Sequence, residues 1–246
     1  MIHQYFDEVQ ALLERAADSQ YRMLEDAAKR IVKTIEQGGV VHLFGTGHSH
    51  MLAEEGFYRA GGLAAIRPIF IESLMLHEGA LRSSNLERRE GLAETFMEGE
   101  DIRPEDVLIV ISTSGKNPVP VDVALWGKEK GAFVISLSSH RYTEQQSSRH
   151  KSGRYLSDVA DLAIDNGSPI GDAVLKHEAI SVRFSSTSTV VGATLMNAMF
   201  AEAIGLLANK GEEPPVFLSG NVAGSLEHNQ KLMERYKHRI DFGKLD

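Results

Sequence analysis

Two loops of this chain combine glycine with hydroxyl and amide side chains, which are groups that bind anions. One has the sequence Gly-Thr-Gly-His-Ser at 45–49, and the other has Ser-Thr-Ser-Gly-Lys-Asn at 112–117. Neighbouring hydroxyls supply donors that rotate to fit a tetrahedral anion, and Gly115 lets the backbone approach it closely. Helix capping is the alternative role, but a cap needs only one such side chain. The second loop therefore predicts a phosphate site, formed by Ser112, Thr113, Ser114 and Asn117.

The sequence around the two loops predicts that both lie at one edge of a parallel sheet. Each loop follows an apolar run of about five residues, at 40–44 and 107–111, and each precedes helix-forming sequence. Such a run is typical of a buried parallel strand, with its loop at the carboxyl end. Ligands of doubly wound sheets bind outside these strand ends, where the strand order reverses. We therefore expect the two loops to form one cradle.

Strand and helix patterns alternate along the rest of the chain. A long amphipathic helix is expected at 5–36, and a C-terminal helical extension at about 215–246. The other expected elements are strands at 65–71, 133–137 and 162–164 and helices at 49–60, 87–98, 119–130, 189–209 and 227–238. This alternation predicts an α/β three-layer sandwich with a doubly wound, five-stranded parallel sheet. Because no linker or repeat interrupts it, we expect a single domain over 1–246.

Composition and charge exclude several classes of function. The net charge is -8 and no basic face is visible, so a nucleic-acid partner is not expected. With 0 Cys, the chain has no disulfide, thiolate nucleophile or cysteine-based zinc site. Neither a signal peptide nor an apolar run near the ~20 residues of a membrane span is visible. We expect a soluble cytoplasmic protein with no membrane partner. The stretch 138–157 has no apolar periodicity and predicts a mobile surface loop.

Several catalytic motifs begin in this sequence but are incomplete. His50 stands where a dinucleotide fingerprint needs its third glycine, which leaves a nicotinamide cofactor as a weak alternative. The loop at 112–117 lacks the first glycine and the final Ser or Thr of a nucleotide-triphosphate loop. His77-Glu78 lacks the second histidine of a zinc protease. His48 and His50 could join a carboxylate in binding a metal, but no closed ligand set is visible, so we expect neither a metal nor a cofactor.

The pattern Gly-x-Gly-x-Ser at 45–49 with Ser-Thr-Ser-Gly-x-Asn at 112–117 resembles the sugar isomerase (SIS) domain. Phosphoheptose isomerase, arabinose-5-phosphate isomerase, the isomerase half of glucosamine-6-phosphate synthase and N-acetylmuramic acid 6-phosphate etherase contain it. The resemblance implies a flavodoxin-like SIS fold, a small phosphorylated sugar as ligand, and a homodimer or higher homo-oligomer. It also implies that the serine-rich loop holds the phosphate, while Gly47 and Ser49 face the sugar.

The residues that would perform catalysis are harder to predict. An aldose–ketose isomerase of the phosphoheptose type needs a carboxylate base beside the carbonyl and an acid for the sugar oxygen. Where the resemblance places a glutamate after the first loop, this chain has Arg59, so we expect Glu55 or Glu78 as the base and His77 as an acid. Two other functions stay open. One is a sensor that binds a sugar phosphate without converting it, and the other is a lyase or etherase acting on a phosphorylated amino sugar.

Overall fold

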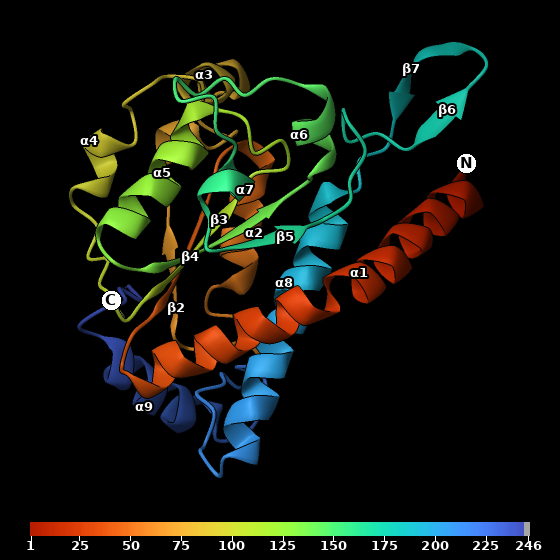
Figure 1. The fold of residues 1–246 in the computed structure, drawn as a ribbon. Coiled ribbons are helices and arrows are strands. Elements are labelled where there is room, and N and C mark those ends of the chain that lie inside the picture. Colours follow the sequence, from red (N-terminus) through yellow and green to blue (C-terminus); the bar gives the residue numbers. More distant parts are fainter. Residues whose placement is uncertain (244–246) are drawn as a thin grey trace.

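A five-stranded parallel sheet lies between two layers of helices in the computed structural model, which describes residues 1–243 (Figure 1). The strand order is β2-β1-β3-β4-β5, and every neighbouring pair is parallel. The strands are β1 (Val41–Gly45), β2 (Ile66–Ile69), β3 (Val107–Ile111), β4 (Phe133–Ser138) and β5 (Leu162–Asp165). The order reverses between β1 and β3, which confirms the predicted doubly wound sheet. Residues 244–246 of the expected C-terminal extension lie outside the described part.

Alternate residues of β3 explain why helices cover both faces of the sheet. Val107, Ile109 and Ile111 belong to one buried cluster, whereas Leu108 and Val110 belong to another. Because successive strand side chains point to opposite faces, a continuous apolar run buries both. The helices over the first face are α1 (Ile2–Glu36), α2 (His50–Gly56) and α8 (Ser188–Asn209), and those over the second are α4 (Glu94–Met97), α5 (Pro118–Glu129) and α7 (Leu156–Val159).

Two helices near the sheet edge differ from the sequence expectation. The helix predicted at 87–98 is interrupted, because α3 (Ala80–Leu86) ends just before Glu87 and Gly91 adopts a φ of 70°. The helix predicted at 49–60 ends at Gly56, because Tyr58 adopts a φ of 46°, which no α-helix accommodates. Both helix interruptions change which residues face the carboxyl ends of the strands, as described below.

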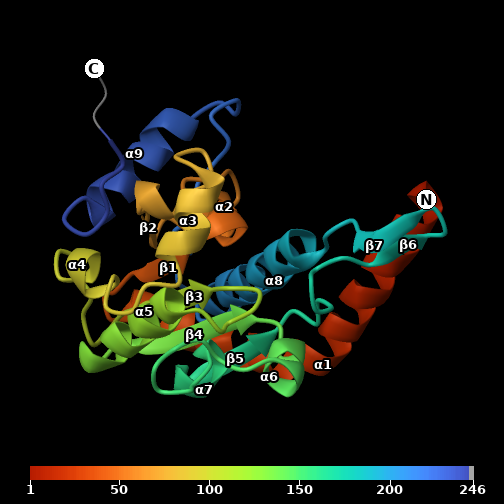
Figure 2. The ribbon, with the colours of Figure 1, turned by 90° about the horizontal axis from the view of Figure 1, so that it is seen from above.

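The segment between β5 and α8 forms an antiparallel hairpin instead of a simple extended crossing. Its strands are β6 (Leu175–His177) and β7 (Ile180–Phe184). The hairpin and the first turns of α1 extend away from the sheet on the same side (Figure 2). The Tyr5 hydroxyl donates to the carbonyl of Ser186 at 2.8 Å, which ties the two together. The remaining helices are α6 (Arg141–Gln145) and α9 (Ser225–Tyr236).

Helix α8 is long and apolar enough to cross a membrane by length and composition, although the sequence showed no such run. Its inner face, however, is packed in the protein core. Val191, Leu195, Met199 and Phe200 are buried in the cluster that α1 and the sheet share. We therefore assign α8 as a core helix.

A buried charge network joins β1 to the C-terminal segment. His42 Nε2 lies 3.1 Å from Asp106 Oδ2, and both side chains are fully buried. Arg239 donates to Asp106 at 2.7 Å, and Arg67 donates to His42 Nδ1 at 3.3 Å. Because a guanidinium only donates, Nδ1 carries a lone pair and Nε2 carries the proton. Burial lowers the pKa of His42, which keeps its ring neutral. Burial alone would raise the pKa of Asp106, but hydrogen bonds from His42 and the Val40 amide outweigh it and lower that pKa.

This network predicts that the free energy of unfolding falls as the pH drops below about 6.5. Below that pH the histidine binds a proton in the unfolded state but stays neutral in the folded protein. The free energy of unfolding then falls by up to about 1.4 kcal/mol per pH unit. The Asp106 contribution is lost only at lower pH, below about 3.9. Thermal melts at several pH values should show a shallower pH dependence for His42→Gln than for the wild type. An unchanged pH dependence of stability in His42→Gln would show that other histidines cause the loss of stability.

Candidate functional site

The two predicted loops lie side by side and line one pocket of about 380 Å³. The first loop follows β1 and passes through a short 3-10 helix (Gly47–Ser49) into α2. The second follows β3 and leads into α5. Because β1 and β3 are neighbours in the sheet, the loops meet where the strand order reverses. The pocket lining includes Gly47, Ser49, Ser112, Thr113, Ser114 and Asn117.

The turn after β1 requires glycine at its first position. A Cβ at Gly45 would lie 2.5 Å from the carbonyl carbon and oxygen of Ser49, closer than any side chain can approach backbone. Gly47 in turn has a φ of 55°, in the region that favours glycine. The first loop can therefore fold back tightly and present its backbone to the pocket.

The second loop keeps several donors free. The backbone N–H groups of Thr113, Ser114, Lys116 and Asn117 form no hydrogen bond with residues 1–243, and neither do the hydroxyls of Thr113 and Ser114. The following helix offers no donors of its own in its first turn, because Pro118 and Pro120 lack an N–H and Val119 N donates to the carbonyl of Glu87. Any anion bound here would therefore be held by the loop itself.

Asn117 does not cap the helix that follows it. It is the first residue before α5, but its side chain forms no capping hydrogen bond. Its Nδ2 donates to Glu87 Oε1 at 2.9 Å, and its Oδ1 accepts from Arg149 at 3.0 Å. Since a guanidinium can only donate, Arg149 fixes which end of the amide faces Glu87. The capping alternative for Asn117 is thereby excluded.

Glu87 is a carboxylate that joins the two loops. Its Oε2 accepts from Thr46 of the first loop at 2.9 Å, and its Oε1 accepts from Asn117 of the second loop at 2.9 Å. The side chain is half-buried and lines the pocket. Sequence reasoning missed Glu87, because it placed this residue inside a helix. Gly91, four residues later, is the signal that could have shown the helix break.

Asp172 is a second carboxylate of the pocket, but both of its oxygens already accept hydrogen bonds from other residues of the protein. Oδ1 accepts from the backbone N–H groups of Thr187 and Ser188 at 3.0 and 2.9 Å, and Oδ2 accepts from the Ser188 hydroxyl at 2.5 Å. These bonds satisfy two of the orphan N–H donors at the start of α8. Asp172 therefore serves as a helix cap on the pocket wall.

Positive charges gather beside the second loop. Burial, together with the nearby charges of Arg149 and Arg88, lowers the pKa of Lys116. The stretch predicted to be a mobile surface loop is tied to this region, because Arg149 N donates to Lys116 O and Leu156 N donates to Gly115 O, both at 2.8 Å. The three cations give this edge a local positive charge in a chain whose net charge is -8.

The structure does not bring the three predicted catalytic residues to the pocket. Glu55 pairs with Arg59 at 2.5 Å and lines a different cavity, of about 250 Å³, between α2 and α8. This follows from the helical turn of α2, which directs Glu55 toward α8. His77 and Glu78 are exposed, and neither lines the pocket.

The histidines considered as metal ligands are engaged or exposed. His50 Nδ1 contacts the carbonyl of Gly47, and His48 is exposed. Among residues 1–243, Glu90, Asp122 and His150 form a group of metal-ligand type. His150 Nδ1 accepts from Ser152 N at 3.2 Å, which places the ring proton on Nε2, 2.8 Å from Asp122 Oδ1. In this hydrogen-bonded form neither ring nitrogen offers a lone pair to a metal.

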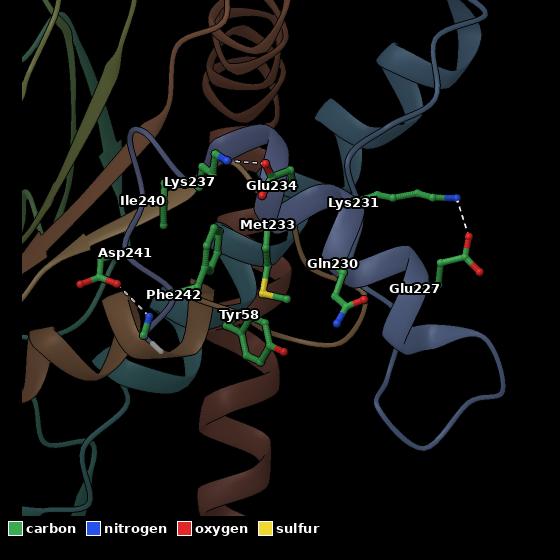
Figure 3. A pocket seen from close by; sticks show the side chains of 11 residues that line it. Tyr58, Glu227, Gln230, Lys231, Met233, Glu234, Lys237, Ile240, Asp241 and Phe242 are labelled. Atoms are coloured by element: carbon green, nitrogen blue, oxygen red, sulfur yellow. Dashed lines mark hydrogen bonds and ion pairs between the residues drawn. The ribbon is translucent and has the colours of Figure 1, made fainter. Parts of the chain in front are cut away.

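A larger cavity, of about 910 Å³, lies between Tyr58 and the C-terminal segment (Figure 3). Tyr58, Met233 and Phe242 give it an apolar lining. Its charged side chains form local ion pairs, such as Lys231 with Glu227 at 2.9 Å. It lies away from the two loops, and residues 1–243 bring no convergent set of free donors to it, so its size does not make it the better candidate for an anion.

A sequence profile of the SIS domain matches residues 4–139. A UPF0309 protein of Halalkalibacterium halodurans is 54% identical over 246 residues, which cover 100% of this chain and 98% of that protein. A UPF0309 protein of Geobacillus sp. (strain WCH70) is 58% identical over 240 residues, 98% of this chain and 97% of that one. The chain belongs to the SIS-domain family. The resemblance deduced from the two loops is thus confirmed.

Two solved structures share the fold of this SIS-domain protein. The phosphoheptose isomerase of Neisseria gonorrhoeae superposes with a TM-score of 0.52 at 14% identity, over 83% of this chain and 97% of that one. The phosphoheptose isomerase of Francisella tularensis gives 0.51 at 17% identity, over 82% and 95%. At such identities the likeness shows the fold, and it confirms the predicted α/β class.

Proposed function

We propose that this SIS-domain protein binds a phosphorylated sugar in the pocket between its two loops and isomerises it between aldose and ketose. The observation that carries the proposal is the set of free donors in the loop at 112–117. The backbone N–H groups of Thr113, Ser114, Lys116 and Asn117 and the hydroxyls of Thr113 and Ser114 form no hydrogen bond with residues 1–243. Such a loop fits a phosphate. The cations Lys116, Arg149 and Arg88 add favourable charge. The phosphoheptose isomerases with the same fold support the choice of substrate class and reaction.

The remaining groups of the pocket suit the sugar part of the ligand. Gly47 and Ser49 of the first loop lie across from the second loop and would contact sugar hydroxyls. The phosphate takes no part in the chemistry, but its binding free energy orients the reacting carbon. We propose Glu87, in place of Glu55 and Glu78, as the base that removes the proton beside the carbonyl.

The phosphate cradle predicts a clear effect of one hydroxyl. Ser114→Ala should weaken sugar-phosphate binding by ~10-fold or more, since a hydrogen bond to a charged group contributes about 1.5–3 kcal/mol. Calorimetric titration with pentose, hexose and heptose phosphates measures this. Ser147→Ala is the control, because Ser147 is exposed and lines no part of the pocket. Equal affinities of Ser114→Ala and the wild type would contradict the cradle.

The same set of sugar phosphates separates isomerisation from the two other functions. In deuterated water, an isomerase exchanges the proton beside the carbonyl and yields the isomer, which NMR detects. Binding without exchange would instead indicate a sensor. Exchange without isomer, or release of a substituent, would indicate lyase or etherase chemistry on a phosphorylated amino sugar.

We further propose that residues 1–246 act as one domain in a cytoplasmic homodimer or higher oligomer. Ile2 and Phe6 of α1 and Ile180 and Val182 of the hairpin are exposed apolar residues on the segments that extend from the sheet. Exposed apolar side chains gathered in this way favour a subunit contact. Light scattering of the purified protein, compared with a Phe6→Glu and Val182→Glu double variant, tests it. A wild type that is monomeric at all concentrations would contradict it.

A further inference from the structure

A second groove of the protein is lined by arginines. Two adjoining cavities of about 460 Å³ each share Leu12, Arg15, Arg141 and Gly167 in their linings, and Arg183 lines one of them. Helices α1 and α6, strand β7 and the loop after β5 supply these residues. The groove thus lies along the part of α1 that extends toward the hairpin (Figure 2).

The arginines of this groove form no ion pair with residues 1–243. Neither Arg15 nor Arg141 forms a side-chain hydrogen bond with these residues, and Arg183 donates to the carbonyl of Val174 at 3.1 Å. Arginines elsewhere, such as Arg67 with Glu100, do pair with carboxylates. Three arginines without a carboxylate partner thus lie together in one groove.

Three acidic residues, Glu8, Asp18 and Asp165, also line the two cavities. Asp165 Oδ1 accepts from the backbone N–H groups of His140 and Gly167 at 3.0 and 2.8 Å. Glu8 and Asp18 lie at exposed turns of α1. Among residues 1–243, none of these carboxylates forms an ion pair with an arginine of the groove.

Part of the wall between the arginines is apolar. Leu12 and Val174 are buried, and Pro169 and Ile170 also line the groove, next to the polar Gln145 and Glu8. Guanidinium groups bind phosphate and carboxylate through paired hydrogen bonds, and an apolar wall suits the body of a small molecule. We propose that this groove is a second anion-binding site, which takes a small metabolite with a phosphate or carboxylate group beside an apolar or sugar body.

The groove is separate from the pocket of the proposed function, although the two share a wall. The Tyr142 hydroxyl accepts from Gly171 N at 2.9 Å and links α6 to the loop after β5. Pro169 and Ile170 line the groove, whereas Gly171 and Asp172 line the pocket. The second site therefore does not depend on the proposed function.

Equilibrium dialysis with radiolabelled inorganic phosphate tests the proposal, because it counts bound ions per chain. The wild type should bind two phosphates, and an Arg15→Gln and Arg141→Gln double variant should bind the second one at least tenfold more weakly. Both arginines are exposed, so the variant should fold normally. A control variant with Arg22→Gln and Arg235→Gln loses the same two positive charges, because both arginines are exposed and neither lines the two cavities.

The outcomes separate this proposal from the proposed function. A single phosphate that Ser114→Ala weakens and the double variant leaves unchanged would overturn the groove and support the first pocket. A single phosphate that only the double variant weakens would support the groove and contradict the first pocket. An equal loss in the control variant would show that the effect depends only on net charge and would overturn the site. A change of oligomeric state in the double variant would assign the arginines to a subunit contact and also overturn it.

Discussion

Glu87→Gln should abolish turnover of the sugar phosphate while the protein still binds it. Glutamine has the shape of glutamate and keeps one oxygen to accept from Thr46 or Asn117, but it cannot take a proton from carbon. General bases contribute about 10²–10⁴-fold to rate, so turnover should fall by at least that factor. Binding should change little, because we propose that the phosphate contacts lie in the loop at 112–117 and not at Glu87. Proton exchange and calorimetry on the same variant measure the two effects separately.

The two other glutamates supply matched controls for this experiment. Glu55 pairs with Arg59 outside the pocket, and Glu78 is exposed. Glu55→Gln and Glu78→Gln make the same chemical change and should each keep nearly the wild-type rate. Wild-type turnover in Glu87→Gln, or loss of turnover in either control, would show that Glu87 is not the base.

Gly45→Ala should disrupt the first loop and remove sugar-phosphate binding. The added methyl would lie 2.5 Å from the backbone of Ser49 and 2.9 Å from the N atom of His50, and neither can move aside without unfolding the turn. Overpacking of this kind costs about 1–3 kcal/mol or more. The melting temperature should therefore fall by several degrees, and calorimetry should detect no binding.

Gly205→Ala is the control for the glycine substitution. Gly205 lies inside α8, and a Cβ there meets nothing within 4 Å. Alanine in a helix interior is favoured over glycine by roughly 0.5–1 kcal/mol, so this variant should melt at or above the wild-type temperature and bind normally. A stable Gly45→Ala protein that binds like the wild type would contradict the tight turn.

Local sequence patterns were sufficient to predict the sheet and the two loops. The run at 107–111 is apolar without alternation, which is typical of a strand buried on both faces, and β3 is such a strand. The loops that follow β1 and β3 had to meet, because parallel strands bring their carboxyl ends to one edge. Both predictions depend only on residues close together in the chain.

Long-range contacts account for what the sequence did not reveal. Glu87 reaches the pocket because α3 ends just before it. Its partners Thr46 and Asn117 lie 41 positions earlier and 30 positions later in the chain. Arg149 contacts Asn117 from a stretch without any periodicity. Counting along the predicted helix from Ser49 gives Arg59 where the resemblance expects a glutamate, and Glu55, about one turn earlier, is the candidate in its place. The structure shows that α2 directs Glu55 toward α8. A single sequence carries no record of such contacts.

A crystal structure of the protein soaked with a sugar phosphate tests the central claim most directly. We expect the phosphate to lie in the loop at 112–117, within hydrogen-bond distance of the Thr113 and Ser114 amides and hydroxyls, with the sugar extending toward Glu87. A phosphate bound elsewhere, with that loop empty at full occupancy of the ligand, would contradict it.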